Sequence, residues 1–117
     1  DEIRLDQPTQ VIELKKNQIT QYSVDPRDFG INMAEAKELD RLSANSVDES
    51  LNLVRESLTN PSSKAGEIVA INAGAAIYTS GIVDDLSAAI SRAQEVIESG
   101  EANKKLTSLA NLTNSLD

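Results

Sequence analysis

The sequence predicts a unit of the α/β or α+β class, with an extended first part and a helical second part. Residues 1–30 contain short runs rich in β-branched residues, whereas residues 34–116 carry apolar residues at helical spacing. A length of 117 residues is typical of one domain, so we expect a single unit over residues 1–117. Two or three strands leave unpaired edges, which indicates part of a larger sheet-and-helix domain.

Three segments of the extended part are expected to form strands. Residues 1–5 have a strand-like pattern that should end near Pro8, because proline cannot donate to a β-ladder. Residues 11–15 and 19–24 are β-branched-rich runs separated by three polar residues. This spacing predicts a hairpin.

Turn and cap residues mark where the helical part begins. Residues 25–30 predict a turn with Pro26 at its second position, and residues 34–42 have a weakly helical pattern. Ser46 and Glu49 form a capping-box pattern that predicts the start of a helix. That helix should end before Pro61, because the residue before a proline avoids the α region. It carries an apolar stripe at helical spacing, which comprises Val47, Leu51, Val54 and Leu58.

The helix expected after Ser63 is apolar on all sides over residues 68–78, which predicts a buried central helix. Asn72 interrupts this stretch and needs a hydrogen-bond partner if it is buried. We favour an amide satisfied by neighbouring backbone over a substrate contact. Three small residues, four apart, would let another element approach closely, and Gly81 suits the position after the helix; the three are Gly66, Ala70 and Gly74.

Two amphipathic helices are expected to close the chain. The first should span residues 84–99 with Gly100 as its stop, and the second residues 101–116. We expect both apolar stripes to belong to the core, because leucine at this spacing is more often core than a partner groove. The stripes are Leu86, Ile90, Ala93 and Ile97, and then Leu106, Leu109, Leu112 and Leu116.

The composition excludes several classes of chemistry. The sequence has no cysteine and no histidine, which rules out disulfides, thiolate nucleophiles and the commonest general base. Carboxylate acid/base work, hard-metal binding and substrate positioning remain. The absence of cysteine fits a reducing compartment, and we expect a cytoplasmic protein.

The charge balance disfavours anionic partners. Nineteen acidic and eleven basic residues give a net charge of −8, which repels phosphate backbones and anionic membranes. We therefore expect no nucleic-acid partner. The apolar stretch of residues 68–78 is too short for a bilayer span, so we expect no membrane partner either.

One acidic pair stands out as a candidate metal site. Asp1 and Glu2 follow each other at the end of an expected strand, and magnesium typically takes one or two carboxylates together with waters and substrate phosphates. The other acidic pairs, Asp48–Glu49 and Asp84–Asp85, are explained by favourable interaction with helix N-termini. No phosphate loop, dinucleotide glycine pattern or complete catalytic constellation is present, so no catalytic residue is assigned.

Several blocks of the sequence, in order, resemble the C-terminal part of the anthranilate phosphoribosyltransferase family. The blocks are DEIRLDQPT at residues 1–9, VIEL at 11–14, ITQY at 19–22, DPRDFG at 25–30 and INAGAAIY at 71–78. The resemblance implies the C-terminal portion of a phosphoribosyltransferase or nucleoside-phosphorylase-like domain. It departs from the family at Gln7, where glycine is frequent, and at residues 42–44, which replace a turn that is often glycine-rich.

The resemblance also implies an activity and a metal. Family members transfer a phosphoribosyl group from phosphoribosyl pyrophosphate to anthranilate in tryptophan biosynthesis, with release of pyrophosphate. Asp1 and Glu2 align with the acidic pair that holds Mg²⁺ against the pyrophosphate. The family's glycine-rich phosphate loop, and the helical domain that binds anthranilate and forms the homodimer, match no residues of this sequence.

From these gaps we expect a fragment or processed product that is inactive alone and works with the remainder of its own chain. The chain also opens without an initiator methionine or a signal-peptide pattern. Two alternatives stay open. One is a segment of a related pyrimidine nucleoside phosphorylase, and the other is a non-catalytic acidic interaction module, which would require cover over the apolar helix.

Overall fold

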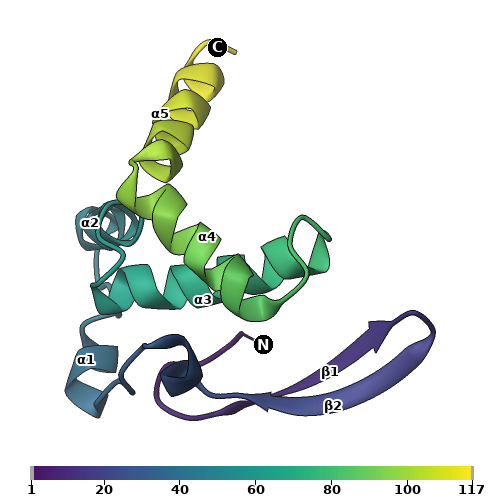
Figure 1. Ribbon diagram of the computed structural model, residues 1–117. Coiled ribbons are helices and arrows are strands. Elements are labelled where there is room, and N and C mark those ends of the chain that lie inside the picture. Colours follow the sequence, from purple (N-terminus) through teal and green to yellow (C-terminus); the bar gives the residue numbers. More distant parts are fainter. Residues whose placement is uncertain (1, 117) are drawn as a thin grey trace.

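A computed structural model describes residues 2–116, and its architecture confirms the predicted α/β class (Figure 1). A two-stranded antiparallel sheet precedes a short 3₁₀ helix at Pro26–Phe29 and five α-helices. The elements are β1 (Thr9–Lys15), β2 (Gln18–Val24), α1 (Ala36–Asp40), α2 (Val47–Ser57), α3 (Lys64–Thr79), α4 (Leu86–Glu98) and α5 (Glu101–Asn114). Within residues 2–116, no helix combines the length and the apolar character needed to cross a bilayer.

The predicted hairpin is confirmed, with a tighter turn than the sequence indicated. Lys15 pairs with Gln18, so only Lys16 and Asn17 form the loop. Both have positive φ, 50° and 62°, which is the conformation of a two-residue type I′ turn. This turn matches the right-handed twist of the strands that it joins.

The strand predicted at residues 1–5 is wrong for the part that the structure describes. Residues 2–5 are extended but belong to no β-ladder, because neither β1 nor β2 lies alongside them as a pairing partner. Their backbone pairs elsewhere: the N–H of Ala34 donates to the carbonyl of Leu5 at 2.9 Å, and a side chain of α3 bonds both polar groups of Ile3.

The predicted cap residues begin the helices as expected, with one difference. Ser46 Oγ accepts from the N–H of Glu49 at 3.1 Å, and Ser63 Oγ accepts from Gly66 at 3.0 Å. The carboxylate of Glu49 accepts from the N–H of Asn45 at 2.7 Å, one residue before the position that a capping box requires. The start of α2 is therefore confirmed, while the reciprocal half of the predicted box is shifted by one residue.

Helix α3 is the central element that the sequence predicted. Figure 1 shows α4 running along one side of it, with the hairpin and the N-terminal segment on the other. The small residues of α3 permit close contacts: a Cβ on Gly74 would lie 2.8 Å from Ile90 Cα, and one on Gly66 would lie 1.9 Å from the carbonyl oxygen of Asn60. Ala70 packs against Ala93 and Ile97 of α4.

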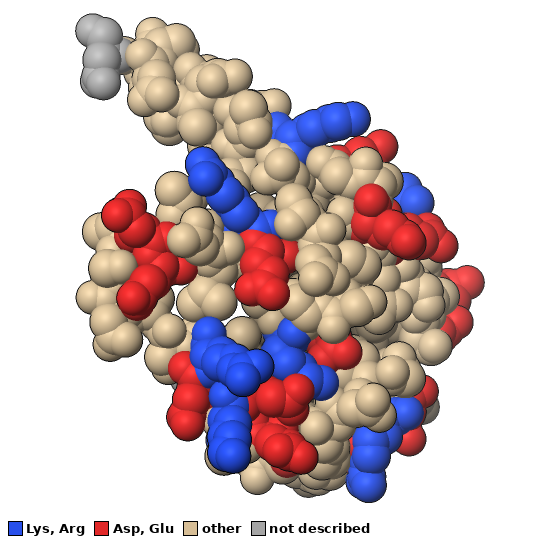
Figure 2. All heavy atoms as spheres, turned by 90° about the vertical axis from the view of Figure 1, so that its left-hand side faces the viewer, with Lys and Arg blue, Asp and Glu red and all other residues tan. Residues whose placement is uncertain are grey.

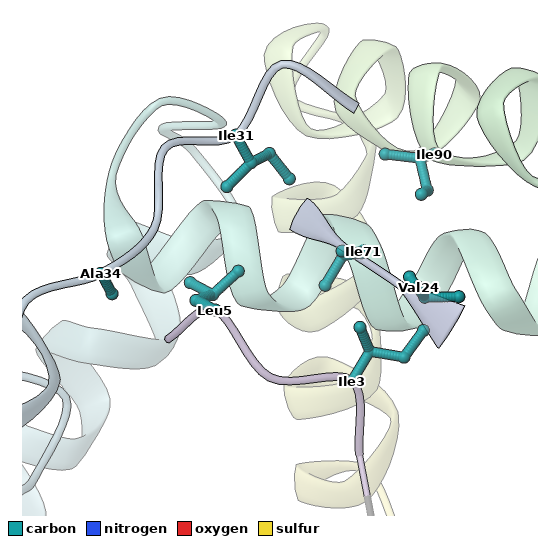
Figure 3. Packing of buried hydrophobic residues seen from close by; sticks show 7 residues of the cluster. All are labelled: Ile3, Leu5, Val24, Ile31, Ala34, Ile71 and Ile90. Atoms are coloured by element: carbon teal, nitrogen blue, oxygen red, sulfur yellow. The ribbon is translucent and has the colours of Figure 1, made fainter. Parts of the chain in front are cut away.

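The core lies between α3, α4 and the non-helical segments. Figure 3 shows side chains from the N-terminal segment, the end of β2 and the loop before α1 converging on α3. Ile71 of α3 is completely buried at their centre. The cluster comprises Ile3, Leu5, Val24, Ile31, Ala34, Ile71 and Ile90.

The stripe of α4 is buried as predicted, but that of α5 is not. Helix α5 follows Gly100 and points away from α3 and α4 (Figure 1). Leu109, Leu112 and Leu116 are 56%, 58% and 77% exposed, so the predicted core role of this stripe is wrong in this chain. The spacing predicted the helix correctly, and Leu106, at its N-terminal end, is half-buried and lines a cavity together with Leu51 and Val54 of α2.

Candidate functional site

The predicted metal pair lies at the start of the N-terminal segment. Asp1 is outside the residues that the structure describes, whereas Glu2 is described and exposed. Residues 2–5 alternate between exposed and buried positions, because successive side chains of an extended chain point to opposite sides. Ile3 and Leu5 enter the core, and Glu2 and Arg4 consequently face outward.

Asn72 fixes the backbone directly after Glu2. Its Oδ1 accepts from the N–H of Ile3 at 2.8 Å, and its Nδ2 donates to the carbonyl of Ile3 at 3.0 Å. Nδ2 also donates to the carbonyl of Ile68, one turn earlier in α3, at 3.0 Å. The prediction that the Asn72 amide is satisfied by neighbouring backbone is confirmed, and sequence reasoning missed only that the partner is the segment next to Glu2.

The charges around Glu2 leave its carboxylate available. Arg4 forms a two-point ion pair with Asp6, with N to O distances of 2.5 and 2.8 Å. Hydrogen bonding from Arg4 lowers the pKa of Asp6, and the same bond raises the pKa of Arg4. Among residues 2–116, Glu2 makes no side-chain hydrogen bond and no ion pair.

The surroundings of Glu2 suit a metal ion that is coordinated partly by a substrate better than one that is coordinated by protein side chains alone. Glu2, Arg4 and Asp6 line a cavity of about 330 Å³. In the part of the chain that the structure describes, no three acidic side chains gather closely enough to hold a metal ion. Magnesium is commonly held by one or two carboxylates and by substrate phosphates, so a hard-oxygen site completed by a substrate fits this arrangement.

A second polar cluster joins the hairpin to the end of α3. The hydroxyl of Tyr78 donates to Glu13 at 2.6 Å and accepts from Lys15 at 2.9 Å, and the Lys15 ammonium lies 4.6 Å from the centre of the ring. Hydrogen bonding to Tyr78 raises the pKa of Lys15. Burial first, and then the nearby Glu13 carboxylate, raise the pKa of Tyr22 on the neighbouring strand. The cluster fastens the hairpin to α3.

This cluster was not among the predictions from the sequence, although the placement of its three residues indicates it. Glu13 and Lys15 lie two apart on β1, so both face the same side of the hairpin. Tyr78 is the only aromatic residue of α3. A tyrosine has an apolar ring and a polar hydroxyl that needs a hydrogen-bond partner when it is partly buried. Tyr78 near the end of α3, and two opposite charges on one face of β1, together indicate a contact between the helix and the hairpin.

Members of the other two acidic pairs lie at helix N-termini. Asp85 Oδ1 accepts from the N–H of Ala88 at 2.8 Å at the start of α4, and Asp48 and Glu49 lie in the first turn of α2. Acidic and basic side chains are interspersed on the face shown in Figure 2, and the projecting end of α5 is largely uncharged. The prediction that these acidic residues lie at helix N-termini is confirmed for Asp48, Glu49 and Asp85.

Comparison with known proteins agrees with the fold and with the resemblance. The profile described as "Glycosyl transferase family, a/b domain" matches residues 1–103. Anthranilate phosphoribosyltransferase from Marinomonas sp. is 43% identical over 97% of this chain and 32% of its own length. The proteins of that name from Methylococcus capsulatus and Teredinibacter turnerae are 45% and 40% identical, each over 97% of this chain and over 32% and 34% of their own lengths.

These matches define the family and the extent of the likeness. The chain spans about a third of the length of the curated relatives that it matches. The match to the family profile extends from the first residue into α5, and thus includes the Asn72 contact and the α3 and α4 core. The resemblance drawn from the sequence blocks is confirmed, and the chain belongs to the glycosyl transferase family, a/b domain.

Proposed function

We propose that this chain is the C-terminal part of an anthranilate phosphoribosyltransferase. The complete enzyme would transfer a phosphoribosyl group from phosphoribosyl pyrophosphate to the amino group of anthranilate and release pyrophosphate. The observation that carries the proposal is the identity of 40 to 45% to proteins of that name across nearly all of this chain. The same proposal includes a role in tryptophan biosynthesis and a cytoplasmic location.

We further propose that Asp1 and Glu2 are the magnesium ligands of this segment. Glu2 is exposed, lines a cavity and is not neutralised by Arg4, whose guanidinium is held by Asp6. A bound Mg²⁺ would neutralise negative charge on the departing pyrophosphate. The contribution of this chain is to present the Glu2 carboxylate from a backbone segment that is held against the core.

The proposal assigns the remaining functions to the rest of the polypeptide. By the resemblance, the phosphate-binding loop and the anthranilate-binding, dimer-forming helical domain belong to sequence outside these 117 residues. We therefore expect the isolated chain to be inactive. The homodimer is likewise a property proposed for the complete enzyme.

The test uses the full-length protein that carries this segment. With phosphoribosyl pyrophosphate and anthranilate, we expect consumption of anthranilate that depends on Mg²⁺. Glu2→Gln should lower the rate and weaken the Mg²⁺ dependence while leaving the melting temperature nearly unchanged. Glu98→Gln, at an exposed glutamate at the end of α4, is the matched control and should leave both properties unchanged.

Three results would each contradict part of this assignment. If the wild-type protein consumes no anthranilate at any Mg²⁺ concentration, the transferase proposal fails. If the same protein instead cleaves a pyrimidine nucleoside with inorganic phosphate, the related phosphorylase replaces it. If transfer is observed and Glu2→Gln has a wild-type Mg²⁺ titration, only the assignment of Glu2 to the metal fails.

A further inference from the structure

The Asn72 side chain bonds both backbone polar groups of Ile3, the residue directly after Glu2. One amide accepts from Ile3 N–H and donates to Ile3 carbonyl, at 2.8 and 3.0 Å, as a neighbouring strand would. The two residues are 69 positions apart in the chain. Residues 2–5 belong to no β-ladder. The Asn72 side chain therefore provides the two backbone hydrogen bonds of Ile3 that a neighbouring strand would otherwise form.

The orientation of the Asn72 amide is fixed by three contacts. Both protons of Nδ2 are used, one toward the Ile3 carbonyl and one toward the Ile68 carbonyl, and Oδ1 faces an N–H group. A rotation of the amide by 180° would place donors against a donor and oxygen against two carbonyls. The side chain therefore has one arrangement, and Ile68 ties it to its own helix.

The helix that carries Asn72 is itself held in place. Two positions along from Asn72, Gly74 lies against the backbone of Ile90, so α3 and α4 cannot shift relative to each other without a clash or a gap. On either side of Arg4, the side chains of Ile3 and Leu5 are buried in the same core. The position of the Glu2 backbone is thus determined by packed helices through one amide.

We propose that Asn72 is a positioning residue for Glu2, the member of the proposed metal pair that the structure describes. This inference rests on the proposed function. Magnesium requires a nearly ideal octahedral geometry, so a carboxylate displaced by a fraction of an ångström binds it less well. The three hydrogen bonds of the Asn72 amide all go to backbone groups, so its proposed role is indirect. Asn72 would act through the backbone of Ile3, whose N–H and carbonyl it holds and whose nitrogen is bonded to Glu2.

The test compares variants of the full-length enzyme in metal binding as well as in rate. Asn72→Leu has a similar size and removes all three hydrogen bonds, and Asn72→Ala removes them without adding any new contact. Ile97→Ala is the matched control, because it opens the other core cluster, formed with Ala70 and Ala93, away from the N-terminal segment. Mn²⁺, which takes the same oxygen ligands as Mg²⁺, is titrated by electron paramagnetic resonance with phosphoribosyl pyrophosphate present.

We expect both Asn72 variants to bind Mn²⁺ about 10-fold or more weakly, as is usual when the support of a metal ligand is lost. The Mg²⁺ concentration for half-maximal rate and the KM for phosphoribosyl pyrophosphate should rise, while the KM for anthranilate changes little. Ile97→Ala should lower the melting temperature with Mn²⁺ affinity unchanged. The second Asn72 variant provides the measurement if the first does not fold.

The remaining outcomes distinguish failure of the proposed function from failure of the role proposed for Asn72. A wild-type enzyme without metal-dependent transfer overturns the proposed function and, with it, this inference. A wild-type enzyme that transfers, together with Asn72 variants of wild-type Mn²⁺ affinity, overturns the inference alone. Equal loss of Mn²⁺ affinity in the Asn72 variants and in Ile97→Ala would show general loosening of the fold, and would also overturn it.

Discussion

Helices α3 and α5 carry apolar residues at helical spacing, yet only α3 lies in the core. Ile71 of α3 is completely buried, whereas Leu109 of α5 is 56% exposed. The difference arises from what lies opposite each helix. Gly66, Ala70 and Gly74 allow α4 and the loop at Asn60 to approach α3 closely, while α5 projects from the end of α4. Periodicity therefore predicts a helix, but burial requires a complementary second surface.

The largest expected contrast is between Ile71→Ala and Leu109→Ala. Removing the Ile71 side chain should leave a cavity and lower the free energy of unfolding by about 2–5 kcal/mol. The same truncation at the exposed Leu109 should change it by about 0.5 kcal/mol or less. Urea titrations followed by circular dichroism measure both. Equal losses in the two variants would mean that α5 is packed as tightly as α3.

The second largest loss of stability is expected where α3 approaches the preceding loop closely. The Cβ of Gly66→Ala would lie 1.9 Å from a backbone oxygen, so the loop or the helix has to move. We expect a loss of about 1–3 kcal/mol. Ala76→Leu, on the exposed side of the same helix, is the control and should be nearly neutral. A neutral Gly66→Ala variant would show that this contact does not determine the packing.

Charges on the exposed stripe should alter surface properties without altering stability. The isolated chain is expected to bind a hydrophobic dye such as ANS through exposed residues that include Leu112. Leu112→Lys should reduce the dye fluorescence while the free energy of unfolding changes by about 0.5 kcal/mol or less. A chain that binds no dye would refute the exposed surface, and Ile90→Val serves as the buried comparison.

The smallest expected effect is a pH dependence at the turn after β2. Hydrogen bonding from Arg27 lowers the pKa of Asp25 below its usual value near 3.8, so the folded state favours the carboxylate. This contribution is fully present above pH 4 and is lost as the pH falls through the lowered pKa. Thermal melts between pH 5 and 2 should show a slightly weaker acid dependence for Asp25→Asn. If melting temperature depends on pH identically in the wild type and in Asp25→Asn, the ion pair of Asp25 with Arg27 does not contribute to stability.

Local signals predicted much of this fold. Ser46 and Ser63 begin their helices, Gly81 and Gly100 follow the ends of α3 and α4 with positive φ, and the hairpin forms where β-branched runs flank a polar turn. These features depend on neighbours in the sequence. They could be predicted because capping and turn geometry are set within a few residues.

Features that depend on distant residues could not be predicted in the same way. Residues 2–5 have a strand-like pattern, but their partner is the side chain of Asn72. The contact of Tyr78 with Glu13 likewise joins elements 65 positions apart. Asp1 and Glu2 were assigned as metal ligands from the resemblance, and this assignment stays a prediction.

Residue-resolved amide hydrogen exchange of the 117-residue chain tests directly whether Asn72 holds the N-terminal segment and whether α5 lies outside the core. We predict strong protection of the Ile3 amide and of the interior of α3, and exchange of α5 amides that is faster by orders of magnitude. An Ile3 amide that exchanges as freely as an unstructured peptide, or an α5 as protected as α3, would contradict this prediction.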